Sequence, residues 1–467
     1  MSQARGGMSS PESVDVVIVG AGFAGLTAAD ALVSKGHSVV VLEGRDRVGG
    51  RSMTGEVAGV KVDMGATWVS LRHTAIRALA ERMGCSFVPQ FHEGRNVLIM
   101  SGRRRTYKST IPKLGPAALV DVARIQMALD RMAKTIDLDA PWESPNAADL
   151  DSISFAEWLN KKRVLYPTRS MMNVVSKVYW GAPPSDVSLL HVLFYINAGQ
   201  GLDHMLDVVN GQQEERIVES TQEIAKRLAA QLGESVVLNA PVRRITQDDS
   251  GVTVSTDSAT YTAQYAISAT APGHRADIEF APALPTKAEG LAKTWHMGAL
   301  SKAYVAYDEP FWRADGLSGE ALTDTGAVFI TFDLSTSADG PGIMLAFCDP
   351  HTFDDFDIET RRSRVLEQLV AMYGDKAANP IDYADHCWGT ESFAPGGPNP
   401  AVAPFATTSY GSALTEPHGR VHWAGSETAG AWAGCMNGAV LSGLRAADDV
   451  ERLLPVAESQ ERKKAYS

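Results

Sequence analysis

The chain has 467 residues, of which 45% are hydrophobic and 21% charged, which is ordinary for a soluble enzyme large enough for two sizeable cores. Its formal net charge of −12 argues against nucleic acid or an anionic membrane as partner, because both require a basic face. The four cysteines form no CxxC pair, so neither a zinc site nor a disulfide framework is indicated.

The two ends of the chain are polar. Residues 1–13 lack an apolar core, which predicts a disordered leader rather than a signal peptide, and 456–467 are expected to form a second disordered tail. No segment approaches the apolar length that a bilayer span requires. We therefore expect a cytoplasmic protein without a membrane anchor.

Residues 14–54 are predicted to form a strand, a glycine turn, a helix and a second strand, which together make a βαβ unit. The strands are expected at Val16–Val19 and Ser38–Leu42, and the helix from about Gly25 to Lys35. In the turn, the three glycines permit a tight bend, close approach of a pyrophosphate, and packing of helix on strand. The turn residues expected to contact a dinucleotide are Gly20, Ala21, Gly22, Ala24 and Gly25.

An acidic residue follows the second strand of this unit. Glu43 lies 18 residues after Gly25, close to the spacing at which a carboxylate accepts hydrogen bonds from an adenosine ribose. A glycine turn that merely connects packed elements would not require this acid. The pattern therefore predicts dinucleotide binding.

The sequence after Glu43 distinguishes FAD from NAD. The run from Glu43 to Arg51, EGRDRVGGR, resembles the ExRxRxGGR continuation of the flavin amine oxidase superfamily. The resemblance implies an FAD site that includes Gly44, Arg45, Gly50 and Arg51, with Arg51 meeting phosphate charge.

Small residues dominate the end of the next segment, residues 57–69. In the resembled family this stretch lies against the flavin, which implies cofactor contacts for Gly65, Ala66, Thr67 and Trp68. The alternative is a strand end packed in the core.

From about Thr74 the hydrophobic period becomes helical, and a mostly helical insertion is expected. Helices are predicted over 74–83, 116–136 and 154–161, with Asp151 or Ser152 able to cap the last. The apolar run 189–196 predicts a buried helix beside a cavity, with Tyr195 as a candidate wall of the substrate pocket and His191 as a core histidine.

Near residue 212 the chain is expected to return to the cofactor domain, with a helix over Thr221–Leu232 and strands after it. The resemblance implies a backbone contact between Val242 and the adenine side of FAD. Relatives carry a glycine pair just before the helix, where this chain has Glu219 and Ser220, so the loop geometry there is left open.

A lysine interrupts the apolar strand predicted at 300–305. A buried ammonium is costly, so Lys302 should have a functional reason or a water partner, unless it lies on the surface of an edge strand. In the resembled family the matching lysine bridges through water to flavin N5, which makes Lys302 the catalytic candidate. On a later strand, diamine-specific relatives place a carboxylate where this chain has Ile330, which predicts an apolar pocket.

The closing segment resembles the C-terminal flavin motif of the same family. The resemblance implies that Gly425, Glu427, Cys435, Met436 and Ala439 contact FAD, with Glu427 near the ribityl and phosphate groups. Trp388 and Trp432 would shape the surroundings of the flavin ring, and Trp432 and Cys435 would border the substrate.

Two departures from the family concern the substrate and the flavin. The aromatic pair that sandwiches the amine in monoamine oxidases is missing, because its positions fall on Cys435 and within 395–399. The cysteine that binds FAD covalently in some relatives corresponds to Pro398, so FAD is expected to be non-covalent.

The sequence thus predicts an α/β fold with a Rossmann-type, glutathione reductase-like FAD domain and a second α+β substrate domain, as in monoamine oxidases. The FAD domain would comprise 14–90, 212–282 and 415–455, and the substrate domain 91–211 and 283–414. The expected function is oxidative deamination of a small amine by FAD, with molecular oxygen reduced to hydrogen peroxide. A desaturase or isomerase, and a dehydrogenase using a protein electron acceptor, are the alternatives, and the choice between monomer and homodimer is open.

Overall fold

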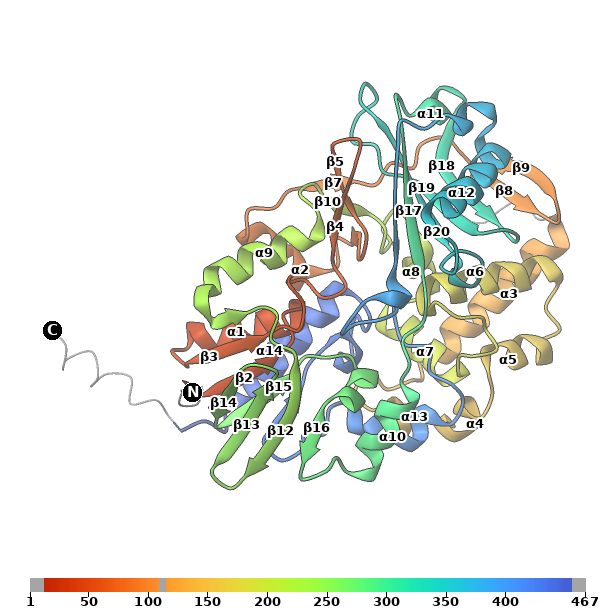
Figure 1. Ribbon diagram of the computed structural model, residues 1–467. Helices are drawn as coiled ribbons and strands as arrows, with labels where there is room; N and C mark the ends of the chain where they lie inside the picture. The colour runs from red at the N-terminus through yellow and green to blue at the C-terminus, as the bar shows by residue number, and fades with distance from the viewer. Residues whose placement is uncertain (1–11, 109–114, 456–467) are drawn as a thin grey trace, which may run out of the picture.

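The computed structural model describes residues 12–108 and 115–455, and Figure 1 shows a parallel sheet at the lower left and a larger sheet at the upper right. The predicted tails at 1–11 and 456–467 lie outside the described residues. Glu12 and Ser13, expected in the leader, instead form the short strand β1 (Glu12–Ser13), which pairs with β14 (Thr260–Ala263).

The parallel sheet is the βαβ unit extended on both sides. Its order is β11 (Val236–Val237), β3 (Val39–Leu42), β2 (Val16–Val19), β15 (Tyr265–Ser268) and β22 (Val421–Trp423). Val16 and Ile18 face helices, whereas Val17 and Val19 face a second sheet. Because the strand is buried on both faces, every one of its residues is apolar.

Helices cover one face of this sheet and antiparallel strands the other. The helices are α1 (Phe23–Ser34), α2 (Thr74–Arg82), α9 (Thr221–Leu232) and α14 (Met436–Glu451). The second sheet has the order β1, β14, β13 (Gly251–Thr256), β12 (Val242–Asp248) and β16 (Glu279–Ala281). The predicted helix over 221–232 is confirmed.

The larger sheet has seven strands. Their order is β21 (Asp382–Cys387), β17 (Ser301–Tyr307), β20 (Gly342–Cys348), β19 (Val328–Asp333), β18 (Leu317–Thr323), β8 (Arg95–Met100) and β9 (Arg103–Tyr107). Helices α11 (Phe311–Ala314) and α12 (Ile358–Tyr373) pack on one face, and the hairpin of β4 (Thr54–Val57) and β5 (Val60–Asp63) on the other. Strand β17 is paired on both sides, so Lys302 is not on an edge strand.

The helical insertion is confirmed but contains strands. Its helices are α3 (Pro116–Ala133), α4 (Ala147–Asp151), α5 (Phe155–Lys161), α6 (Tyr166–Trp180), α7 (Leu189–Ala198) and α8 (Leu202–Leu206). The prediction that Asp151 or Ser152 caps α5 is wrong. Ser154 caps it instead, because its hydroxyl accepts from the Glu157 N–H while the Glu157 carboxylate accepts from the Ser154 N–H.

The remaining elements are short. A small sheet joins β6 (Trp68–Val69), β10 (Glu215–Ile217) and β7 (Phe87–Pro89), and helices α10 (Thr286–Thr294) and α13 (Ala406–Tyr410) pack together. The 3₁₀ helices are η1 (Pro141–Glu143), η2 (Gly233–Ser235), η3 (Pro272–Asp277), η4 (Pro350–Thr352), η5 (Asp375–Ala378), η6 (Trp388–Thr390), η7 (Gly411–Leu414) and η8 (Ser426–Thr428).

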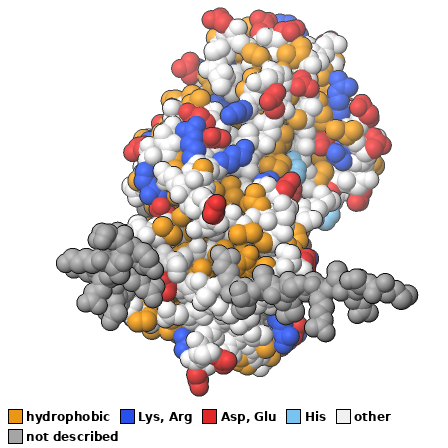
Figure 2. All heavy atoms as spheres, turned by 60° about the vertical axis from the view of Figure 1, so that its left-hand side comes forward, with side chains coloured by type: hydrophobic (Ala, Val, Ile, Leu, Met, Phe, Trp, Pro, Cys, Tyr) orange, Lys and Arg blue, Asp and Glu red, His pale blue; other side chains and the backbone are white. Residues whose placement is uncertain are grey.

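The molecular surface carries both signs of charge. Figure 2 shows acidic and basic side chains interspersed on the face turned forward, with hydrophobic side chains between them. Within residues 12–108 and 115–455, no helix is both long and apolar enough to cross a bilayer.

Candidate flavin and substrate cavity

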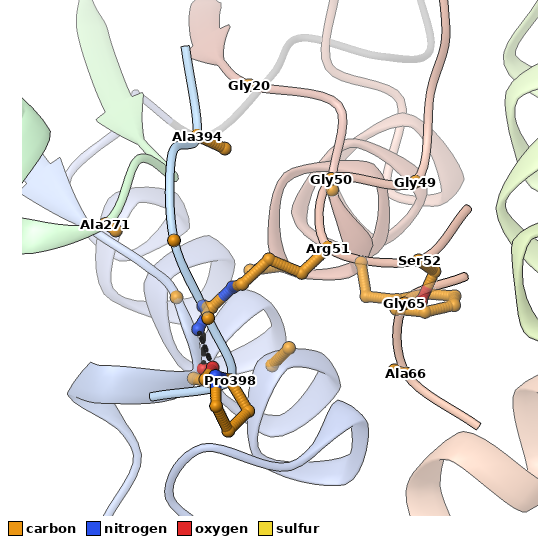
Figure 3. A pocket seen from close by; sticks show the side chains of 18 of the residues that line it. Gly20, Gly49, Gly50, Arg51, Ser52, Gly65, Ala66, Ala271, Ala394 and Pro398 are labelled. Atoms are coloured by element: carbon orange, nitrogen blue, oxygen red, sulfur yellow. Dashed lines mark hydrogen bonds between the residues drawn. The ribbon is translucent and has the colours of Figure 1, made fainter. Parts of the chain in front are cut away.

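A cavity of about 720 Å³ opens where the carboxyl ends of β2 and β3 meet the larger sheet. It is in the size range of small-molecule and cofactor sites. Segments far apart in sequence line it together, and Figure 3 shows Gly20, Gly50, Gly65 and Pro398 around it. The predicted site residues on its wall are Gly20, Gly22, Ala24, Glu43, Gly44, Arg45, Gly50, Arg51, Gly65, Ala66, Thr67, Trp68, Val242, Lys302, Trp388, Gly425, Cys435, Met436 and Ala439.

The glycine turn forms one end of the cavity, and its geometry depends on missing side chains. Gly20 has φ +101°, in the region that favours glycine. A Cβ on Gly25 would lie 2.0 Å from the carbonyl oxygen of Gly20, so only glycine lets α1 start this close to β2. The first turn of α1 consequently points its free N–H groups at the cavity, as phosphate binding requires.

Glu43 is buried at the end of β3 and borders the same end. Its Oε2 accepts from the Ala21 N–H at 2.8 Å, and its Oε1 accepts from the Arg45 N–H at 3.1 Å. A carboxylate has about four lone-pair positions, so both oxygens can still accept hydrogen bonds from ribose hydroxyls. Ala21 therefore acts by orienting Glu43, although it does not line the cavity itself.

Arg51 joins the two sequence motifs across the cavity. Its Nη1 donates to the Pro398 carbonyl at 2.9 Å (Figure 3) and lies 2.7 Å from Glu427 Oε1. Its Nη2 donates to Ser426 Oγ at 3.0 Å. Two of these contacts are hydrogen bonds, to Pro398 and Ser426, and the contact with Glu427 is an ion pair. Buried Glu427 Oε2 has no hydrogen-bond partner among the described residues, which suits a hydroxyl donor such as the ribityl chain.

The backbone after β5 runs tightly along the cavity wall. A Cβ on Gly65 would lie 1.9 Å from the Arg51 carbonyl oxygen and 2.9 Å from the Trp388 ring. Trp388 is fixed there because its Nε1 donates to the Met64 carbonyl at 2.8 Å. The glycine turn, Glu43, the orphaned Glu427 oxygen and this side-chain-free wall together fit an FAD molecule.

Lys302 lies at the inner end of the cavity and is 5% exposed. Its Nζ donates to the carbonyl of Asp63 at 3.1 Å, to the Gly65 carbonyl, and to Thr67 Oγ1 at 2.6 Å. Burial lowers the pKa of Lys302 to about 7, and the charge of the Asp63 carboxylate opposes that shift. Burial thus makes this ammonium easier to deprotonate than that of an exposed lysine.

The wall next to Lys302 mixes aromatic and amide side chains. Tyr179 comes from α6, and Phe347 is the register partner of Lys302 on β20. Gln212 lies 3.8 Å from the sulfur of Cys435. Burial raises the pKa of the Cys435 thiol to about 12, so this group stays neutral and non-nucleophilic.

Three predicted substrate residues lie away from this cavity. Tyr195 lines a second cavity of about 780 Å³, and Glu427, predicted to contact FAD, borders that cavity rather than the first. Ile330 is buried in the core between the larger sheet and β5. Trp432 packs edge-on against His73, with ring centroids 4.6 Å apart. The structure does not bring these three side chains to the wall beside Lys302.

Sequence reasoning missed several residues that border or support this wall. Asp63 and Ser220 hold the backbone under Lys302, and Tyr179, Gln212 and Asn399 line the cavity. Asp63 could have been found, because an acid ends an alternating strand directly before the small residues at 65–67. Tyr179 carries no such signal, since its helix lies far away in sequence and has an ordinary amphipathic pattern.

Comparison with known sequences gives consistent results. The family model for flavin containing amine oxidoreductase matches residues 23–451. AofH of Mycobacterium tuberculosis, assigned as a flavin-containing monoamine oxidase, is 49% identical over 454 residues, covering 97% of this chain and 100% of AofH. L-amino acid dehydrogenase of Synechocystis sp. is 32% identical over 464 residues, covering 96% of this chain and 97% of that protein.

Solved structures agree over nearly the whole chain. Putrescine oxidase bound to putrescine superposes with a TM-score of 0.90 at 30% identity, covering 95% of this chain and 100% of that one. Cyclohexylamine oxidase from Brevibacterium oxydans gives a TM-score of 0.90 at 31% identity, covering 94% of this chain and 99% of that one.

The contacts of Glu43 predict the effect of removing its charge. Because a hydrogen bond to a charged group contributes about 1.5–3 kcal/mol, Glu43→Gln should weaken FAD binding about tenfold or more. Titration of the apoprotein with FAD, followed by flavin fluorescence, measures this. Glu367→Gln, an exposed change on α12, is the control. Equal affinities for Glu43→Gln and the control would show that Glu43 does not bind the ribose.

Proposed function

Because the chain belongs to the family of flavin-containing amine oxidoreductases, we propose that this oxidoreductase deaminates an amine and passes the electrons to molecular oxygen. Family membership and the structural likeness confirm the resemblance, the α/β fold class and the FAD cofactor predicted from the sequence. The products would be an imine, which hydrolyses to an aldehyde or ketone, and hydrogen peroxide.

The observation that carries the proposal is Lys302, a buried cation at the inner end of a cavity whose other end suits a dinucleotide. Bound FAD supplies the acceptor for the hydride that leaves the α-carbon of the amine. Lys302, whose three N–H donors are taken by Asp63, Gly65 and Thr67, would present a positive charge where negative charge develops. A buried positive charge at this place serves electron transfer to the flavin, whereas a protein that only stores the cofactor has no use for it.

The cavity wall would exclude bulk water from the amine. Trp68, Leu300 and Phe347 provide an apolar surface beside Lys302, and the polar atoms there are mostly amide groups. A neutral amine held against such a wall needs no side chain to take its proton before hydride transfer. The missing aromatic pair is replaced by Tyr179 from α6 and the small neutral thiol of Cys435.

Amino-acid oxidation is the second candidate, since one relative is named L-amino acid dehydrogenase. A substrate carboxylate would need a free cation. The three arginines that line the cavity are each paired with a carboxylate: Arg45 with Glu391, Arg51 with Glu427, and Arg243 with Asp257. This pairing favours an amine without a carboxylate.

The acids of the cavity also favour a monoamine over a diamine. The acids that line it are Glu43, Asp277 and Glu391, and each contacts a basic side chain. Arg45 pairs with Glu43 and Glu391, and Asp277 is largely exposed beside His274, so none of these lining acids is a buried unpaired carboxylate that would hold a distal ammonium; burying an unpaired ammonium is costly.

Butylamine and putrescine test substrate preference as a matched pair, because they differ only in the distal amino group. We expect kcat/KM for butylamine to exceed that for putrescine by about tenfold or more, measured as amine-dependent peroxide release. A higher value for putrescine would contradict the assignment of an apolar pocket. Amine-dependent reduction of a dye without peroxide would instead indicate a dehydrogenase, and flavin turnover without any amine would indicate a desaturase or isomerase.

Replacing Lys302 by methionine tests its catalytic role, because methionine keeps the volume and removes the charge. We expect Lys302→Met to slow flavin reduction or reoxidation about a hundredfold or more while FAD remains bound, since a charge at this place stabilises the transition state by about 3 kcal/mol. Stopped-flow absorbance identifies the affected half-reaction, and Lys293→Met on α10 is the control. Rates within threefold of the parent in both half-reactions would remove Lys302 from the mechanism.

A further inference from the structure

Asp63 closes strand β5 directly beneath Lys302, and it is 5% exposed. Its Oδ1 accepts three hydrogen bonds from the start of α9: from Ser220 Oγ at 2.7 Å, from the Thr221 N–H at 2.8 Å and from Thr221 Oγ1 at 3.0 Å. Its carbonyl oxygen accepts from Lys302 Nζ at 3.1 Å and from the Tyr304 hydroxyl at 2.6 Å. One residue therefore touches α9 through its side chain and Lys302 through its backbone.

The start of α9 is shaped to receive a negative charge. Ser220 has φ +81°, a conformation that glycine adopts at less cost, and it precedes a helix of twelve residues. A serine at this position is strained, but its hydroxyl is aimed at the Asp63 carboxylate. The hydroxyls and the positive end of the helix dipole together favour the ionised carboxylate.

Two buried basic side chains and one phenol from other elements lie near Asp63, and Lys302 and Tyr304 contact its backbone carbonyl. Lys302 and Tyr304 lie on β17, and Arg216 on β10 is also buried. Arg216 additionally faces Asp333 and Arg313. On β21, His386 is the register partner of Lys302, but its Nε2 pairs with Glu391 at 3.2 Å.

The pKa values of Asp63 and Lys302 are each shifted by burial, and neighbouring polar or charged groups oppose each shift. Burial raises the pKa of Asp63, and the hydrogen bonds from Ser220 and Thr221 oppose that rise. Burial lowers the pKa of Lys302, and the Asp63 carboxylate is the charge that opposes it. In a poorly solvated site, an opposite charge nearby favours the charged form of its partner.

We propose that Asp63 is a positioning residue whose buried carboxylate, held by the start of α9, keeps Lys302 protonated in the flavin cavity. The inference rests on the proposed function only for the task of Lys302, which is to present a positive charge where the transferred electrons arrive. Asp63 touches neither substrate nor cofactor in this account. It acts through Lys302 alone.

The direct test is Asp63→Asn in the FAD-loaded protein. Asparagine keeps an Oδ1 acceptor for Ser220 and Thr221 but removes the charge. Loss of an adjacent opposite charge lowers the pKa of an ammonium, so the titration of Lys302 should move to lower pH by about one unit or more. NMR of protein labelled with ¹³C at the lysine ε-carbon follows this titration, and Lys302→Met assigns the signal.

Two further variants separate charge from packing. Asp333→Asn is the matched control, because Asp333 is also a buried carboxylate but binds Trp312 and Arg313 rather than Lys302. It should leave the Lys302 titration unchanged. Ser220→Gly suits the backbone conformation and removes one hydrogen bond to Asp63, so it should shift the Lys302 titration downward by less than Asp63→Asn does.

The outcomes are independent of substrate identity, because the titration is measured without an amine. A downward shift in Asp63→Asn, with FAD still bound and the control unchanged, supports the proposal, and the pH profile of flavin reduction should move in the same direction. An unchanged Lys302 titration in Asp63→Asn overturns it. If Asp63→Asn fails to fold, an unchanged titration in Ser220→Gly overturns it. A protein that shows the shift but oxidises no amine would contradict the proposed function and leave the coupling of Asp63 to Lys302 intact.

Discussion

The burial of one lysine ammonium constrains the whole site. Lys302 lies on a strand paired on both sides, so it cannot reach water by moving to an edge. Its three acceptors all come from residues 63–67, which forces that backbone to lie against the larger sheet. Gly65 is required there, because a Cβ would collide with the Arg51 carbonyl. The position of the cavity wall thus follows from satisfying one buried charge.

An ion pair between half-buried Arg51 and buried Glu427 holds the opposite wall. Arg51 belongs to the segment after the βαβ unit and Glu427 to the segment before α14, and their contact brings the two flavin motifs to one cavity. Neither oxygen of Glu427 has a hydrogen-bond partner among the described residues, and Oε2 also lacks an ion-pair contact, which a fully internal structural pair would not leave. The buried polar network around Glu427 is therefore incomplete at the place where a cofactor hydroxyl would complete it.

The residues at the cofactor end of the cavity could be predicted from short-range sequence patterns alone. The apolar run at 16–19, the glycine turn and Glu43 are adjacent in sequence, and their spacing determines their geometry. The substrate end depends on long-range packing instead. Ile330 shares a face of the larger sheet with its register partner Phe347 but lies one strand farther from Lys302, among core side chains, and Tyr195 on α7 lines the second cavity. Strand β8 was missed although it forms a local antiparallel hairpin with β9, and its other neighbour, β18, lies more than two hundred residues later.

One departure from the family pattern, at Ser220, has a structural role. Ser220, where relatives carry glycine, adopts a glycine-like backbone and gains a hydrogen bond to Asp63. The division into two domains remains a prediction, as do the individual site assignments.

The central claim is that an amine delivers its electrons to the flavin in this cavity. Mixing the FAD-loaded protein with butylamine in the absence of oxygen, while recording the flavin absorbance, tests it most directly. The absorbance of oxidised flavin should bleach with the amine and return when air is admitted. Absorbance that stays unchanged with butylamine and with every other apolar amine, in protein whose flavin dithionite still reduces, would contradict it.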